Sequence, residues 1–155
     1  MIIFIKNNFK FLLISLFLVF ISKNIYAEEF GNKDEALSLL ERAVSLVKVD
    51  KNRALDLFTS GDGGLHPKDL YPFCVNNDGV LVAHPTNIGL NIINFKDSSG
   101  KEVGKQMIDI AKYGEVNEVD FMIARLTTGD KKEYKKTQLV TRVSGIICVV
   151  GYYTE

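Results

Sequence analysis

The feature that most constrains the fold is a series of apolar segments separated by turns too short for a crossover. The segment "VLVAH" follows the turn "NNDG", and the last two segments are separated only by "SG". Parallel neighbouring strands need a connection of a dozen or more residues, whereas antiparallel neighbours need only a hairpin turn. We therefore expect an antiparallel sheet, with Asp78 and Gly79 supplying positive φ angles in the first hairpin. Its five strands are predicted at residues 70–75, 80–84, 118–126, 137–143 and 146–153.

Helical patterns precede and interrupt these strands. Asn32 and Glu35 have the spacing of a capping box before a run of apolar residues at helical spacing, which predicts a long N-terminal helix. Asp50 is expected to cap a second, short helix that the glycines of "TSGDGG" end. A third helix is predicted in the middle of the chain, with Ser99 and Glu102 as another capping box. The prediction is an α+β domain whose helices cover one face of the sheet.

Residues 1–27 are expected to be a secretory signal peptide. Two lysines precede the apolar run "FLLISLFLVFI", whose 11 residues fall short of the roughly 20 helical residues that span a bilayer. The polar stretch "SKNIYA" then places the small residue Ala27 where a signal peptidase cuts. The alternative is an N-terminal membrane anchor, because Ile25 is bulkier than the usual residue at its position. Residues 28–155 are predicted to form a single domain, periplasmic or secreted.

Charge and motif content exclude several classes of function. Residues 1–27 contain three lysines and no acidic residue, so the remaining chain has 16 basic and 19 acidic residues and a net charge of about −3. That balance argues against nucleic acid binding. His66 and His84 lack metal-ligand spacing, and no phosphate loop or nucleophile motif stands out. We expect no enzyme activity, no metal and no cofactor.

The two cysteines, Cys74 and Cys148, fall in the middle of the first and last predicted strands. In an exported protein they form a disulfide if those strands pair and bring the Cα atoms within about 7 Å. The other possibility is two buried thiols that pack as small apolar side chains. Neither cysteine belongs to a Cys-x-x-Cys motif, which disfavours a thiol oxidoreductase. Export makes the disulfide the favoured interpretation.

Several short motifs follow one another in a fixed order along the chain. They are "DLYPFCV", "NNDG", "VLVAHP", "GLN" and "KDSSGK", followed by "EVDFMIAR", "KTQLVTRV" and "VVGYY". In this order and spacing they resemble the extracytoplasmic Cache sensor domains, specifically the single Cache domain type 2 in a stand-alone exported form. The resemblance extends from about residue 34 to residue 153. Exported members of this kind are similar in carrying a cysteine in the first and last strands, which further favours the disulfide.

The resemblance implies both a fold and a function. The implied fold is PAS-like, with a long N-terminal helix packed on a five-stranded antiparallel sheet and a small-molecule pocket on one face. The implied function is non-enzymatic sensing of a small anionic metabolite such as an organic acid. The signal would pass to a separate partner such as a membrane receptor or kinase. The alternative is a structural or protein-interaction module with a closed or degenerate pocket.

Strand alternation nominates the residues of such a pocket. On the second strand, alternate residues counted back from His84 share its face, and on the third strand Phe121, Ile123 and Arg125 share one. An organic acid needs convergent donors among apolar walls, which His84, Arg125 and Lys136 can supply. The competing interpretation of each candidate is a solvent-facing charge or a strand-end residue.

The chain also departs from the pattern that it resembles. Ile123 stands where relatives tend to have tryptophan, Leu126 where they have proline, and Leu139 where they have tyrosine. Loss of two aromatic rings would enlarge the pocket, change its ligand or end ligand binding.

Overall fold

The computed structural model describes residues 29–125, 129 and 131–154. The predicted signal peptide at residues 1–27 lies outside these residues, and so does Leu126. Within the part of the chain that is described, no helix is both long enough and apolar enough to cross a membrane.

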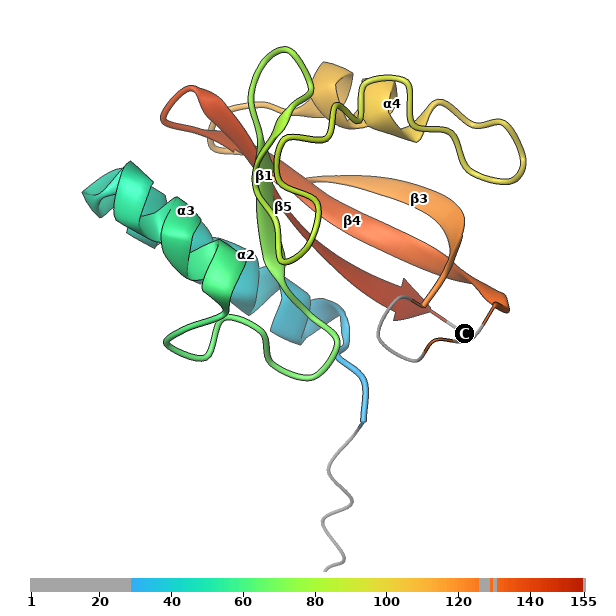
Figure 1. The fold of residues 1–155 in the computed structure, drawn as a ribbon, viewed down its shortest axis with the longest axis horizontal. Helices are drawn as coiled ribbons and strands as arrows, with labels where there is room; N and C mark the ends of the chain where they lie inside the picture. The colour runs from blue at the N-terminus through green and yellow to red at the C-terminus, as the bar shows by residue number, and fades with distance from the viewer. Residues whose placement is uncertain (1–28, 126–128, 130, 155) are drawn as a thin grey trace, which may run out of the picture.

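The domain is built on one five-stranded sheet. Its strands are β1 (Pro72–Val75), β2 (Leu81–Ala83), β3 (Asn117–Ala124), β4 (Glu133–Val143) and β5 (Ile146–Thr154). All neighbouring strands are antiparallel, in the order β2-β1-β5-β4-β3 (Figure 1). The central strand is β5, which pairs with β1 on one side and with β4 on the other. The predicted PAS-like α+β fold with an antiparallel sheet is therefore confirmed.

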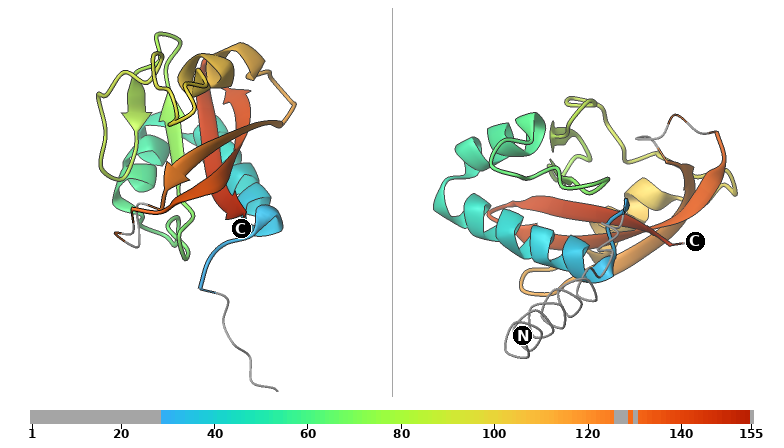
Figure 2. Two further views of the ribbon diagram at one scale, coloured as in Figure 1. Left: turned by 90° about the vertical axis from the view of Figure 1, so that its right-hand side faces the viewer. Right: turned by 90° about the horizontal axis from the view of Figure 1, so that it is seen from below.

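Two helices open the domain, α2 (Lys33–Val49) and α3 (Lys51–Ser60). The capping box of α2 is confirmed, because Asn32 Oδ1 accepts from Glu35 N at 3.0 Å and Glu35 Oε2 accepts from Asn32 N at 3.1 Å. Asp50 caps α3 as predicted, by accepting a backbone N–H of the first turn. Both helices pack on the same face of the sheet (Figure 2).

The third helix, α4 (Val103–Ile110), packs on the opposite face, so the prediction that the helices cover one face is wrong. The second capping box is also wrong. Glu102 is the N-cap residue of α4 but makes no side-chain cap bond. Both the N–H and the hydroxyl of Ser99 donate to Asp97 Oδ1, at 2.9 and 2.6 Å. Ser99 therefore belongs to a turn organised by Asp97, which competes with the helix cap.

Side-chain alternation along β5 creates two separate cores. Cys148 and Val150 face α2 and α3, whereas Ile147 and Val149 face α4. Every residue from 146 to 152 is buried. The apolar run "IICVV" thus belongs to a strand that is covered on both faces, which is why it lacks a polar side. A sheet with two buried faces needs helices on both, and α4 supplies the second cover.

Strand β4 starts at Glu133, four residues before the predicted boundary. Lys135 and Lys136 lie before the predicted start of the fourth strand, in a run of charged residues, yet both pair with β3. Their side chains point to opposite faces: that of Lys135 is 51% exposed, whereas Lys136 is 4% exposed. A charged run can continue a strand when one of its faces stays in water and the buried charge finds partners.

The hairpin between β1 and β2 forms as predicted, with two differences. β2 ends at Ala83, so His84 follows the strand instead of closing it. In the turn, Gly79 has a φ of 80°, but Asp78 does not adopt a positive φ. Asn76 Oδ1 accepts from the backbone N–H groups of residues 78 and 80, and this side-chain turn replaces the expected second positive φ.

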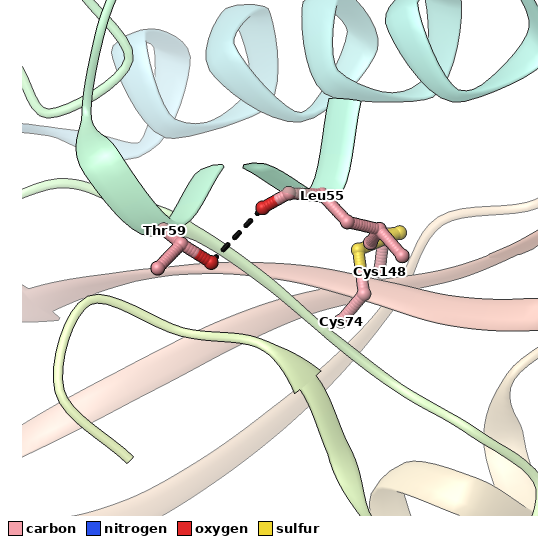
Figure 3. The surroundings of a disulfide bond; sticks show 4 residues. All are labelled: Leu55, Thr59, Cys74 and Cys148. Carbon is pink, nitrogen blue, oxygen red and sulfur yellow. Dashed lines mark hydrogen bonds between the residues drawn. A yellow bond between two sulfur atoms is a disulfide. The ribbon is translucent and has the colours of Figure 1, made fainter. Parts of the chain in front are cut away.

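Cys74 and Cys148 form a disulfide between β1 and β5, which confirms the predicted pairing. The two residues stand directly opposite each other in the antiparallel register, with Cα atoms 4.2 Å apart. Both are fully buried, and Figure 3 shows the bond beneath α3, beside Leu55. Because 74 residues of sequence separate the cysteines, the bond closes a loop containing about half the chain.

We expect the double variant C74A/C148A to lose about 4 kcal/mol of unfolding free energy. The physical reason is that the disulfide removes the freedom of a long loop from the unfolded chain. Urea unfolding of the oxidised wild type and of the variant, followed by circular dichroism, measures the difference. Equal unfolding free energies for the two proteins would contradict this prediction.

Candidate ligand-binding site

A cavity of about 140 Å³ lies on the face of the sheet that α4 covers. Between β2 and α4 the chain turns back along the outer edge of β2. Leu81 N donates to Leu90 O at 2.9 Å, and Ile92 N donates to Gly79 O at 2.8 Å. This returning segment covers the edge strand and places Leu90 and Ile92 in the wall of the cavity.

The cavity has a largely apolar wall with a few polar side chains. Phe73 comes from β1, Phe121 and Ile123 from β3, and Met107 from α4. The polar side chains in the lining are Tyr71, His84, Asn87, Lys136 and Gln138. An apolar enclosure with a few polar groups is the usual composition of a small-molecule site.

A glycine allows α4 to approach the returning segment closely. A Cβ at Gly104 would lie 1.7 Å from Ile92 O, and the Gly104 N–H donates to Phe95 O at 3.2 Å. Any side chain at this position would push the helix away from the wall that Ile92 and Phe95 form.

His84 is buried in the site with its tautomer fixed by the backbone. Its Nδ1 accepts from Thr86 N at 3.1 Å and from Asn87 N at 3.2 Å, so the proton of the neutral ring lies on Nε2. Burial, followed by the positive charge of Lys136, lowers the pKa of His84 to about 4. At neutral pH the ring is therefore uncharged, and Nε2 can donate one hydrogen bond.

Lys136 brings a cation into the same lining. Its Nζ lies 4.5 Å from the ring centroid of Tyr153 and 5.1 Å from that of Tyr71, and it donates to Tyr153 Oη at 3.5 Å. Burial lowers the pKa of Lys136 to about 8, and the charge of Arg125 also lowers it, whereas Asp69 raises it. The aromatic faces replace part of the lost hydration of the ammonium group.

The space for the Lys136 side chain is left by Gly151 of β5. A Cβ at Gly151 would meet Lys136 Cε at 2.5 Å and Gln138 Cγ at 3.2 Å. The glycine lies opposite Gln138 in the register, so both polar side chains of β4 extend over it toward the cavity.

Arg125 lies beside the cavity but is absent from its lining. The guanidinium carbon sits 3.5 Å from the ring centroid of Phe30, 4.8 Å from that of Tyr153 and 5.0 Å from that of Tyr134. The residue is only 5% exposed. Its charge acts on the site through Lys136 and not through a contact with the cavity.

Sequence reasoning missed Asp69, which lies close to the same group of charges. The residue is 4% exposed, and its Oδ1 accepts from Gly31 N at 2.7 Å. Its charge raises the pKa values of both Lys136 and Tyr71, although burial is the main reason that the pKa of Tyr71 rises to about 12. Asp69 therefore offsets part of the positive charge of Lys136 and Arg125.

The structure brings four of the five predicted ligand-binding residues together. His84, Phe121, Ile123 and Lys136 line one cavity, and Arg125 stands outside it. The predicted alternation on the second strand fails, because Val82 packs on the core beneath α2 and α3 while His84 lies on the cavity side. His84 changes face because the strand has already ended at residue 83.

The structure shows where two of the departures from the family pattern lie, those at residues 123 and 139. Ile123 lines the cavity, so the absence of tryptophan there does affect its wall. Leu139 belongs to the core beneath α2, so the absence of tyrosine there leaves the cavity unchanged. Gln138 was missed, although alternation from Lys136 would have found it had the strand been extended to residue 133.

The arrangement suits recognition of an anion more than chemical catalysis. Lys136 is the one charged side chain among the residues that line the cavity, and the neutral His84 adds a donor. The lining contributes no carboxylate, so the local charge is positive despite the nearby Asp69. A small anion would balance the buried ammonium group and accept hydrogen bonds from both side chains.

One known protein family matches most of the domain that the structure describes. A family model described as Cache domain matches residues 64–154. No curated protein sequence matches the chain. The matched region contains all five strands, the disulfide, α4 and every residue of the cavity lining.

Solved structures of sensor domains share the fold. A methyl-accepting chemotaxis protein from Vibrio parahaemolyticus is 19% identical, with 78% of this chain and 87% of that chain covered and a TM-score of 0.62. A periplasmic sensor domain of a chemotaxis protein is also 19% identical, with 79% of this chain and 90% of that chain covered and a TM-score of 0.56. A Cache chemosensory domain described for its carboxylic acid recognition is 23% identical, with 77% of this chain and 86% of that chain covered and a TM-score of 0.57. At these identities the likeness concerns the fold.

We expect K136M to raise the unfolding free energy at pH 7 by on the order of 3 kcal/mol. Lys136 has a pKa of about 8 when folded and an ordinary value of 10.5, so below pH 8 the folded state carries the cost of burying a charge. Between pH 8 and 10.5 the unfolded chain binds more protons, and the wild type gains stability as the pH rises. K136M should lack this gain.

Urea unfolding from pH 7 to pH 9.5 measures this difference. K135M is the matched control, because Lys135 is the neighbouring residue on the exposed side of β4 and forms an ion pair with Asp120 at 2.8 Å. If K136M and the wild type show the same slope of stability against pH, the buried charge of Lys136 is not what limits stability.

Proposed function

The chain belongs to the Cache domain family, and from that membership we propose that it senses a short monocarboxylate bound in the cavity beside His84 and Lys136. The observation that supports this most is the presence of a buried ammonium group and a neutral imidazole donor in one largely apolar lining. The carboxylate would accept from Lys136 Nζ and from His84 Nε2. Its short chain would contact the aromatic and aliphatic wall.

The charge balance favours one carboxylate over two. Lys136 is the one charged side chain in the cavity lining, and His84 is neutral at pH 7. A single negative charge therefore neutralises the lining, whereas a second carboxylate would be buried against an apolar wall with no second cation in the lining to pair with it. Burying an unpaired charge is strongly unfavourable.

The size of the cavity sets the length of the ligand. A cavity of about 150 Å³ in another protein is known to hold a benzene molecule, so about 140 Å³ accommodates roughly six non-hydrogen atoms. Acids of two to four carbons fall in this range. The presence of such a cavity supports ligand binding over the alternative of a module with a closed pocket.

One structural relative gives independent support for the ligand class. The Cache chemosensory domain that shares 23% identity was described for its recognition of a carboxylic acid. The same class of ligand is what the charges of the present cavity favour. The proposed role is non-enzymatic, since the cavity groups are arranged to bind and not to transfer a group.

The proposed cellular setting follows from the N-terminal sequence. Residues 1–27 would direct export to the periplasm or the exterior as a cleaved signal peptide, or would remain as a membrane anchor. Residues 28–155 would act as the sensor domain and pass the signal to a separate membrane receptor or kinase. The buried disulfide suits an oxidising compartment.

Isothermal titration of the oxidised protein with acetate, propionate, pyruvate and lactate tests the proposal. We expect at least one of them to bind at pH 7 and K136M to weaken that binding tenfold to a hundredfold, as the loss of a charge-assisted hydrogen bond implies. K135M is the matched control and should bind as the wild type does. No heat with any of the four acids would rule the proposal out.

The pH dependence of binding provides a second readout. A bound anion stabilises the protonated form of Lys136, so its pKa should rise from about 8 and binding should take up protons at pH 8. Affinity should therefore fall as the pH increases above about 8. Titrations in two buffers of different ionisation enthalpy measure the proton uptake. At ligand concentrations high enough for K136M to bind, this variant should show no proton uptake.

A further inference from the structure

Gln138 is the other polar side chain that β4 contributes to the cavity, and it makes none of the proposed carboxylate contacts. It is 6% exposed, lines the cavity, and lies on the same face of the strand as Lys136. Among the residues that the structure describes, its Oε1 has no hydrogen-bond partner. Its register neighbours on β3 and β5 are Val119 and Gly151, and neither has a polar side chain.

A buried amide without a partner is unfavourable unless something else satisfies it. Leucine would fill a similar volume against the same apolar neighbours without leaving a carbonyl unpaired. Gly151 leaves room for the Gln138 side chain to extend, since a Cβ there would come within 3.2 Å of Gln138 Cγ. The Gln138 side chain is thus accommodated over Gly151, next to that of Lys136, but the protein provides no donor for its Oε1.

The chemistry of the lining restricts which group could satisfy the amide. An ammonium group on the ligand would be buried near Lys136 and Arg125 with no carboxylate in the lining to pair with it. A keto oxygen could accept from the amide nitrogen but would leave Oε1 without a donor. A hydroxyl group both donates and accepts, so it can pair with either end of the amide after rotation about the last side-chain bond.

Resting on the proposed function, we propose that Gln138 recognises a hydroxyl group on the bound carboxylate, so that the site prefers a short hydroxy acid. The carboxylate would lie at Lys136 and His84, the hydroxyl at Gln138, and the carbon chain against Phe121 and Ile123. Residues 136 and 138 are separated by about 7 Å along the strand, and their long side chains converge over Gly151. That spacing suits a hydroxyl one or two carbons from the carboxylate.

Isothermal titration with L-lactate, D-lactate, propionate and pyruvate tests this inference. These acids share three carbons and one carboxylate and differ at the second carbon. We expect the preferred lactate enantiomer to bind about tenfold more tightly than propionate or pyruvate, because it alone completes the hydrogen bonds of the amide. The enantiomers should differ, since three fixed contacts define one hand of the ligand.

The variant Q138L should bind lactate about tenfold more weakly while binding propionate as tightly as the wild type or more tightly. Q138M serves as a second variant if Q138L folds poorly. Q106L is the matched control, because Gln106 lies on α4 and is absent from the cavity lining. It should leave all affinities unchanged.

The outcomes separate this inference from the proposed function. If propionate binds the wild type as tightly as both lactates, or if Q138L weakens lactate and propionate equally, the role of Gln138 is overturned while carboxylate binding stands. If none of the four acids binds and acetate does not bind either, the proposed function fails and the inference fails with it. If acetate alone binds, the inference is overturned while carboxylate binding stands. Selective weakening of lactate binding in Q138L, with K136M weakening the binding of all four acids, supports both.

Discussion

Strand β5 pairs with β1 on one side and with β4 on the other, and the candidate site depends on that double pairing. His84 follows the hairpin that contains β1, whereas Lys136 belongs to β4. The two side chains come together only because β5 holds the two parts of the sheet in register. The disulfide between Cys74 and Cys148 crosslinks β1 to β5 within this arrangement. A slip of one residue in either pairing would move the cavity side chains to the other face of the sheet.

The charged groups around the cavity also contact the start of the domain. Arg125 stacks on Phe30, and Asp69 accepts from the N–H of Gly31, both just before α2. The charges of Arg125 and Asp69 in turn act in opposite directions on the pKa of Lys136. Two charged groups that act on Lys136 therefore also contact the residues just before α2. Burial makes the charge of Lys136 sensitive to a bound anion, and it also lowers the unfolding free energy of the protein. Functional sites often combine these two effects.

Local sequence patterns determined most of the secondary structure. The capping residues Asn32 and Asp50, the short turns and the apolar runs depend on neighbours within a few positions, so they could be recognised without the fold. The resemblance to Cache domains also came from ordered local motifs. Strand ends were less predictable, because the charged run around Lys136 joins β4 only once β3 and β5 are beside it. The missed Gln138 follows from that boundary, since Lys136 fell outside the predicted fourth strand and no alternation was counted from it.

The sequence by itself therefore determined the element types, the antiparallel connections and the candidates His84 and Lys136. Only the tertiary structure decided that α4 covers the second face, that Arg125 stands outside the cavity, and that Gln138 stands inside it. These outcomes depend on which side chains alternate toward which face and on where each strand stops. Both are fixed by contacts between segments far apart in the chain, as with the approach of α4 to the backbone at Ile92 that Gly104 permits. No local pattern specifies such contacts, because their energy comes from packing that exists only when the whole sheet is assembled.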